Sequence, residues 1–237
     1  MDRTTEAAIR ILSETCKKYK HHEKYSMQGM EKEKLHHLKV LEWVRELDSN
    51  PSQALELAAL FHDIDRIVNP GVAGGFKGDR KSKAYLRHKR NHARRSADFA
   101  ASALKGIVKD KKTMEKTLFL IAHHDDDWRR IKKAKSPELE CLVAADVFGF
   151  FETYAQRIHE LEGEERLRDK VRFMVEKLPD KARIMLWEHE LKDGISNRIK
   201  NEVIKEYYIK NNPGEKIYKF CPNCRTRLSR KKKLKKK

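Results

Sequence analysis

Hydrophobic residues recur along most of the chain at the three- and four-residue intervals of an amphipathic helix. This pattern predicts helices over residues 2–18, 31–48, 50–66 and 80–104, and over about 163–177, 180–192 and 195–211. Asp110 and Ser136 are predicted N-caps of two further helices, the second continuing to about Glu160. No strand alternation, βαβ order or internal repeat is present, so the expected fold class is all-α.

Glycine and proline mark the expected breaks between these helices. Residues 19–29 and Asn69–Gly78 are predicted loops, and the second holds four of the ten glycines. Asn50 and Pro51 predict the start of the third helix, as its N-cap and its first helical residue. The composition favours one sizeable domain with an appendage, because 39% of the 237 residues are hydrophobic and 38% are charged.

Membrane segments and a disulfide framework are not expected. No apolar run approaches the roughly 18 residues that span a bilayer, and Met1 is not followed by a charged and then apolar leader. The protein is therefore expected to be soluble and cytoplasmic, without membrane contact. Four cysteines in a chain of this length indicate thiols or a metal site rather than a set of disulfides.

Basic residues are concentrated in the last part of the chain. Lys216–Lys237 contains eleven Lys or Arg and no acid, which leaves +7 of the formal charge of +18 on residues 1–215. Such a segment can bind nucleic acid nonspecifically through counterion release, or it can be only a cationic, solubilising terminus. Cys221 and Cys224 in this segment are typical of one knuckle of a zinc ribbon. They supply half of a four-ligand structural zinc site. The pair can therefore bind zinc with ligands from elsewhere, or bind no metal.

The most informative stretch is the run Ala58–Phe61, which ends in His62 and Asp63. The apolar residues predict a buried helix, so this polar pair emerges at the edge of a core. Leaving both groups desolvated without partners would cost several kcal/mol. A bound cation satisfies both groups at once. The alternative is a structural pair, in which Arg66 neutralises Asp63 and His62 bonds a backbone carbonyl.

Four other predicted helices each carry a residue able to bind metal on or at the end of an apolar face. These residues are His36, His92, His123 or His124, and Asp146. His36 is preferred to His37 because it is in phase with Val40 and Val44, whereas His37 lies about 100° around the helix. Each histidine taken singly is more typical of a structural role. Imidazoles combined with carboxylates suit Mn, Fe, Co, Ni or Zn, as one ion or two.

This order of residues resembles the HD superfamily of metal-dependent phosphohydrolases, with its pattern H…HD…H…H…D. The resemblance is carried by LHHLKVLEWVREL, LAALFHDIDR, NHARRSADFA, LIAHHDD and ECLVAADVFGFFE, which together span about Leu35 to Glu152. It implies an HD-type helical bundle that binds metal over residues 1–160. A helical extension over 161–212 is expected to pack on this core, followed by a tail over 213–237 with the Cys-x-x-Cys knuckle.

The resemblance also implies a set of ligands. His36, His62, Asp63 and Asp146 would hold one metal. His92 and His123, with His124 as the substitute, would hold a second one bridged by Asp63. Asp65 departs from the family pattern, which often has glycine at this position, and the sequence offers no account of it.

The implied chemistry is hydrolysis of a phosphate ester, such as a nucleotide or a related small phosphate. A divalent metal lowers the pKa of bound water from 15.7 toward about 7. Asp63, Arg66 and Asp125 are the expected catalytic residues. One of Asp125, Asp126 and Asp127 can act as acid or base or bond a histidine, and the others form a solvated helix end. Cations on the glycine-rich loop and the following helix can bind substrate phosphate, or form an ordinary solvated face; these are Lys77, Arg80, Lys83 and Arg95, with Arg87 and Arg94 beside them.

Two other functions remain open. Some relatives of this kind are di-iron oxygenases that act on a small polyol or a phosphonate, and a requirement for O₂ would distinguish them. The chain can also be a nucleic-acid-binding protein that uses residues 216–237 on an HD scaffold.

Overall fold

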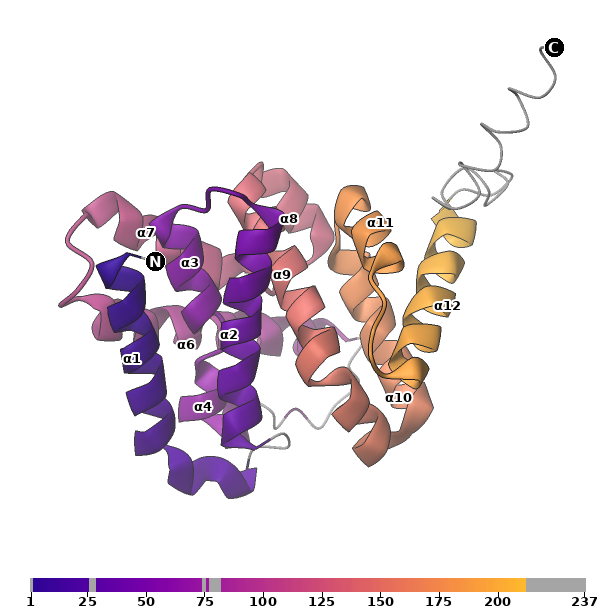
Figure 1. Cartoon of the computed structure of the whole chain (residues 1–237), viewed down its shortest axis with the longest axis horizontal. Helices are drawn as coiled ribbons and strands as arrows, with labels where there is room; N and C mark the ends of the chain where they lie inside the picture. Colours follow the sequence, from indigo (N-terminus) through magenta and orange to yellow (C-terminus); the bar gives the residue numbers. More distant parts are fainter. Residues whose placement is uncertain (1, 26–28, 74–75, 77–81, 212–237) are drawn as a thin grey trace, which may run out of the picture. The chain divides into compact units, whose positions relative to one another are not determined.

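The computed structural model describes residues 2–25, 29–73, 76 and 82–211, and none of these residues lies in a strand. The expected all-α fold is confirmed. The helices of the first part are α1 (Arg3–Lys18), the 3₁₀ helix η1 (Lys20–Tyr25), α2 (Met30–Leu47), α3 (Gln53–Phe61), α4 (Asp65–Val68), α5 (Pro70–Ala73), α6 (Lys83–Leu104), α7 (Lys111–His123), α8 (Trp128–Ala134) and α9 (Pro137–Thr153). They are followed by α10 (Ala155–Lys177), α11 (Asp180–Glu188) and α12 (Gly194–Asn211) (Figure 1).

The chain forms two compact units, residues 1–157 and 158–237. The division falls inside α10, a few residues before the boundary after residue 160 that the sequence suggests. Residues 213–237, with the Cys-x-x-Cys knuckle and the basic tail, lie outside the described residues. No helix in the described part of the chain is both long enough and apolar enough to cross a membrane.

Side-chain caps explain most helix starts. Asp110 accepts a hydrogen bond from the backbone N–H of Thr113, and Ser136 accepts one from Leu139, so both predicted caps are confirmed. The prediction for α3 is wrong by two residues, because Ser52 and not Asn50 is the N-cap. The Ser52 hydroxyl accepts from the backbone N–H of Leu55 at 3.2 Å.

Two further expectations need correction. α3 ends at Phe61 rather than near Arg66, since residues 62–64 form a turn that leads into the short helix α4. The predicted loop over 19–29 contains η1, and the one after Asn69 begins with α5.

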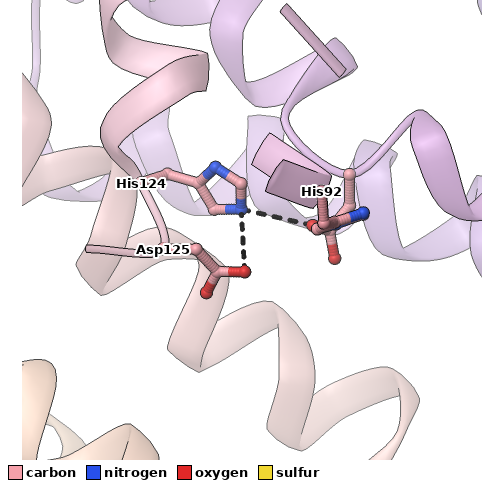
Figure 2. Close-up of side chains that lie close together, drawn as sticks. His92, His124 and Asp125 are labelled. Atoms are coloured by element: carbon pink, nitrogen blue, oxygen red, sulfur yellow. Dashed lines mark hydrogen bonds and ion pairs between the residues drawn. The ribbon is translucent and has the colours of Figure 1, made fainter. Parts of the chain in front are cut away.

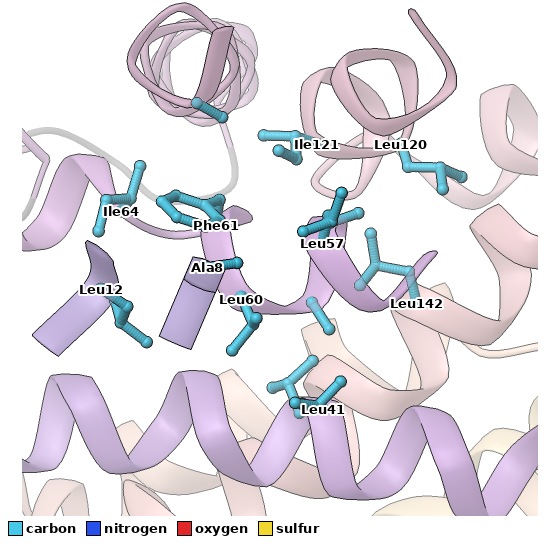
Figure 3. Close-up of a cluster of buried hydrophobic side chains, with 14 of the residues drawn as sticks. Ala8, Leu12, Leu41, Leu57, Leu60, Phe61, Ile64, Leu120, Ile121 and Leu142 are labelled. Carbon is cyan, nitrogen blue, oxygen red and sulfur yellow. The ribbon is translucent and has the colours of Figure 1, made fainter. Parts of the chain in front are cut away.

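α3 is the central helix of the first unit. Every residue from Ala54 to Phe61 is buried, as expected for a helix that is apolar on all sides. α2 packs against α3 and, along most of its length, against α9, while α7 packs against α3 and α6 (Figure 1). Figure 3 shows the resulting core, in which Leu57, Leu60 and Phe61 meet side chains of the surrounding helices. The C-terminal end of α3 is thereby held inside the unit, and this places the residues that follow Phe61.

Gly149 allows the close approach of α2 and α9. A Cβ at this position would lie 2.8 Å from Val40 Cγ2 and 3.4 Å from His36 Nδ1. We expect Gly149→Ala to destabilise the protein by about 1–3 kcal/mol, because α2 and α9 must move apart. Urea unfolding measures this, with Gly106→Ala as the matched control, since nothing lies within 4 Å of a Cβ there. Equal stability of the two variants would contradict the close packing.

The second unit has a buried apolar core, and ion pairs between α10 and α12 lie on its surface. Arg168 pairs with Glu202 and Glu206, and Arg198 pairs with Glu164 at 2.7 Å. Arg183 of α11 is fully buried, donates to the carbonyl of Val175 at 3.0 Å and lies 4.0 Å from the ring centre of Tyr207. Such cation–π contacts and carbonyl hydrogen bonds satisfy a guanidinium that would otherwise be costly to bury.

Lys200 makes the second unit sensitive to pH. Burial lowers the pKa of this amine from 10.5 to about 8, while its Nζ donates to the carbonyl of His189. Because the unfolded chain binds more protons between these two values, Lys200 should contribute a stability that rises with pH through this range. We expect the stability of the wild type relative to Lys200→Met to increase by on the order of 2 kcal/mol between about pH 7 and pH 10. Urea unfolding at both pH values tests this, and a constant difference would contradict it.

Candidate metal centre

Seven buried histidine and aspartate residues converge in the interior of the first unit. They come from α2 (His36), the turn after α3 (His62 and Asp63), α6 (His92), the end of α7 (His124 and Asp125) and α9 (Asp146). Each is at most 5% exposed. Burial of so many ionisable groups requires that they satisfy one another or bind a cation.

The first cluster consists of His36, His62 and Asp146. The Nε2 atoms of His36 and His62 lie 3.3 Å apart, and they are 3.3 and 3.6 Å from Asp146 Oδ1. Three ligand atoms within reach of a single point form a set that can hold a metal ion.

The second cluster consists of Asp63, His92, His124 and Asp125. Asp63 Oδ1 lies 2.7 Å from His92 Nε2 and 3.2 Å from His124 Nε2. Asp125 Oδ2 lies 3.7 Å from His124 Nε2. Figure 2 shows the imidazole of His124 with Asp125 beside it and His92 nearby. These four residues can also hold a metal ion.

In all four histidines of the two clusters, Nδ1 is engaged away from the centre and Nε2 points into it. His62 Nδ1 contacts the carbonyl of Ala59 at 2.9 Å, and His124 Nδ1 contacts that of Ile121 at 2.7 Å. Carbonyls only accept, so both histidines carry their proton on Nδ1. Outer hydrogen bonds of this kind orient histidine ligands in metal sites.

The same holds for His36 and His92. Thr153 donates its hydroxyl proton to the carbonyl of Gly149 at 2.7 Å, so its oxygen accepts from His36 Nδ1 at 3.2 Å. His92 Nδ1 donates to Asp65 Oδ2 at 2.9 Å. With only the Nδ1 proton in place, the inward Nε2 atoms would be acceptors that face other acceptors, so each cluster requires a further proton or a cation between them.

Asp63 lies between the two clusters. Its Oδ1 belongs to the second cluster, while its Oδ2 lies 4.0 Å from His62 Nε2 of the first and accepts from Arg66 Nε at 2.5 Å. Burial favours the neutral acid, but Arg66, His92 and His62 hold the pKa of Asp63 well below its ordinary value. Asp63 is thus a charged carboxylate that faces both clusters. Likewise, burial opposes protonation of His62, but Asp63 and Asp146 raise its pKa above the ordinary value.

Asp65, for which the sequence offered no account, supports His92 from outside. Its carboxylate accepts from His92, from Asn69 Nδ2 at 2.9 Å and from Arg95 Nη2 at 2.7 Å. Burial acts against ionisation, but these hydrogen bonds lower the pKa of Asp65 to about 2. A carboxylate on the outer nitrogen of a ligand histidine fixes its tautomer and makes it more basic.

Lys89 is a residue that the sequence interpretation missed. Its amine is buried and forms an ion pair with Asp125 Oδ2 at the edge of the second cluster. Burial lowers its pKa, but Asp125 raises it above the ordinary value, so the amine stays charged. The signal was present in the sequence, because Lys89 precedes His92 by three residues and therefore lies on the same face of a helix.

The structure corrects the choice between His123 and His124. His123, which the sequence favoured, has a side chain that is 45% exposed and bonds Asp126 at 2.7 Å, outside both clusters. For the first ligand, the preferred His36 does lie in a cluster. His37 is fully buried beside His62, its pKa is lowered by burial and by the neighbouring His62 and His36, and its ring nitrogens have no hydrogen-bond partner among the described residues.

The two predicted phosphate-binding residues that the structure describes, Arg95 and Lys83, do not face the clusters. Arg95 is occupied by Asp65, and Lys83 is exposed on the face of α6 opposite His92. The cations placed at the clusters are instead Arg66 and Lys89. Lys77, Arg80, Cys221 and Cys224 lie outside the described residues.

A protein-family model described as a domain of unknown function, DUF4202, matches residues 6–199, which include both clusters. The chain belongs to this family. No curated protein and no solved structure matches the chain. The description of DUF4202 names no activity.

Proposed function

We propose that this DUF4202 protein is a metal-dependent hydrolase of phosphate esters, related to the HD superfamily. The observation that carries the proposal is the set of four buried histidines, each with Nδ1 bonded outward and Nε2 directed at Asp63 or Asp146. Their order in the sequence and their grouping match the pattern H…HD…H…H…D. A divalent transition metal such as Mn, Fe, Co, Ni or Zn fits these mixed ligands.

The residues present suit one or two ions. His36, His62 and Asp146 would hold the first ion, His92 and His124 the second, and Asp63 faces both. A bound ion would supply Lewis acidity, lowering the pKa of water and polarising a phosphoryl oxygen.

The remaining charged residues stabilise negative charge and accept a proton during the reaction. In hydrolysis of a phosphate ester, the water oxygen forms a bond to phosphorus, the ester P–O bond breaks, and the leaving alcohol takes up a proton. Arg66 and Lys89 are charged groups beside the clusters, and they stabilise negative charge on the phosphoryl oxygens. We assign Asp125 to accept the proton of the attacking water, with Lys89 holding its carboxylate in place.

The test compares two neighbouring histidines. The purified protein is stripped with a chelator, reloaded with single metals and screened for phosphate release from nucleotides and other phosphate monoesters, with and without O₂. We expect release that depends on metal and not on O₂. It should be lost in His124→Gln and kept in His123→Gln, whose side chain lies outside the clusters. Release that survives complete metal removal, or equal activity of the two variants, would refute the proposal, and O₂-dependent turnover would indicate an oxygenase.

A further inference from the structure

The outer face of α6 carries four basic residues in one stripe: Lys83, Arg87, Arg90 and Arg94. We call this set the α6 stripe. With a rotation of 100° per residue around the helix axis, the four side chains lie within about 60° of one another and about 140–180° from that of His92. Lys83, Arg87 and Arg94 are exposed, and Arg90 is half-buried. The helix thus presents His92 to the interior and the stripe to solvent.

The four residues of the α6 stripe are unpaired within the described residues, although Asp98, four residues after Arg94, lies near the same face. No hydrogen bond or ion pair within the described part of the chain involves any of its four residues. In the second unit, by contrast, Arg168, Arg172 and Arg198 are all paired with glutamates. Like charges three and four residues apart on a helix repel one another and destabilise it. The stripe is therefore a surface that an external polyanion would stabilise.

We propose that the α6 stripe binds the phosphate backbone of a nucleic acid. From Lys83 to Arg94 the stripe extends about 16 Å along the helix, enough to meet several phosphates of one strand. Three of its four residues are arginines, whose planar guanidinium matches phosphate oxygens in a bidentate manner. The net charge of +18 adds a long-range attraction for such a partner.

An anionic membrane is the less suitable partner. Helices that lie on membranes insert large apolar side chains beside their basic residues. The apolar face of α6 is buried against the rest of the unit, and none of the exposed large hydrophobic residues in the described structure lies on α6. The contacts expected from the stripe are to phosphates alone, so binding should show little preference for base sequence.

Binding at the stripe is independent of the proposed hydrolase activity. The side chains of the stripe point away from the face of α6 that carries His92, so their loss should leave the metal content unchanged. A chain without any metal could still bind nucleic acid through α6, and a metal-loaded chain could fail to do so. The two proposals therefore fail separately.

The experiment uses the full chain and a short duplex, with fluorescence anisotropy at several salt concentrations between roughly 50 and 200 mM. The triple variant Lys83→Gln, Arg87→Gln and Arg94→Gln is compared with the control Arg168→Gln, Arg172→Gln and Arg198→Gln, which removes the same charge. Each lost phosphate contact lowers the slope of log K against log salt by about 0.9. We expect the α6 variant to lose about 2–3 units of slope and at least tenfold in affinity, and the control to lose neither.

Three results would overturn the proposal. Equal losses in both triple variants would show that total charge decides binding. No loss in either, or no binding by the wild type, would show that α6 makes no phosphate contact. If the α6 variant lost binding to vesicles containing phosphatidylserine but bound nucleic acid as the wild type does, the stripe would be assigned to a membrane instead.

Discussion

Asp63→Ala is expected to abolish binding of divalent metal at both clusters and to lower phosphate release by roughly 10³-fold or more. The reason is the position of Asp63, whose Oδ1 faces His92 and His124 and whose Oδ2 faces His62. Without this carboxylate the first cluster keeps only Asp146 as an anionic ligand, and the second keeps only Asp125, which is neutralised by Lys89. Elemental analysis of the purified variant measures the metal content directly.

Removing Asp63 also leaves Arg66 without its carboxylate partner, so the variant needs a control for folding. Asp126→Ala is the matched control, because Asp126 is another nearly buried acid of the same unit whose partner, His123, lies outside the clusters. It should retain wild-type metal content. If Asp63→Ala remained fully loaded, the central role of Asp63 would be disproved.

Asp65→Asn should weaken metal binding at the second cluster by about 10–100-fold and leave the first cluster loaded. The two oxygens of Asp65 accept hydrogen bonds from His92, Asn69 and Arg95. An amide at this position sets an N–H donor against one of these donors, so the orientation of His92 is lost. The expected result is a chain that keeps one of two ions in a metal titration.

The control for Asp65→Asn is Asp98→Asn, since Asp98 is an exposed acid of the helix that carries His92. Its metal titration should match the wild type. Equal weakening at both clusters in Asp65→Asn would mean that Asp65 supports the fold as a whole rather than His92.

The helical fold was predictable because the spacing of hydrophobic residues and the N-cap residues indicate the same helices along most of the sequence. Asp110 and Ser136 are caps by residue type and position alone. The start of α3 was not predictable in this way. Asn50, Pro51 and Ser52 all suit a helix start, and only the packing of the helix selects Ser52. Local preferences of this kind are comparable in energy, so tertiary contacts decide between them.

The choice between His123 and His124 needed the burial pattern of α7, because in the sequence both histidines follow apolar residues at helical spacing. The buried residues of α7 are Thr117, Leu120 and Ile121, and His124 continues this series at helical spacing. His123 instead lies four residues after Phe119, which is 39% exposed, and their rings lie side by side. Once the buried face of α7 is known, the phase argument that selects His36 on α2 also selects His124 on α7.

Other residues of the site were beyond sequence reasoning. Asp65 reaches His92 only because α4 and α6 lie together, at a separation of 27 residues. The sequence places Lys89 on the face of His92, but its pairing with Asp125 joins α6 to the turn after α7 and could not be foreseen. Arg95 was expected to bind phosphate, but the same contact between α4 and α6 directs it to Asp65. Pairings between segments far apart in the chain leave no periodic signal in either segment.

The first cluster draws its ligands from α2, the turn after α3, and α9, and His36 and Asp146 are separated by 110 residues. An ion held there would act as a reversible cross-link between helices that lie far apart in the sequence. Since the unfolded chain cannot assemble these ligands, free metal at 100 times its dissociation constant would add about 2.7 kcal/mol to the stability of the first unit. Its melting temperature would then report the free metal concentration, and the supply of metal would influence how much folded protein persists.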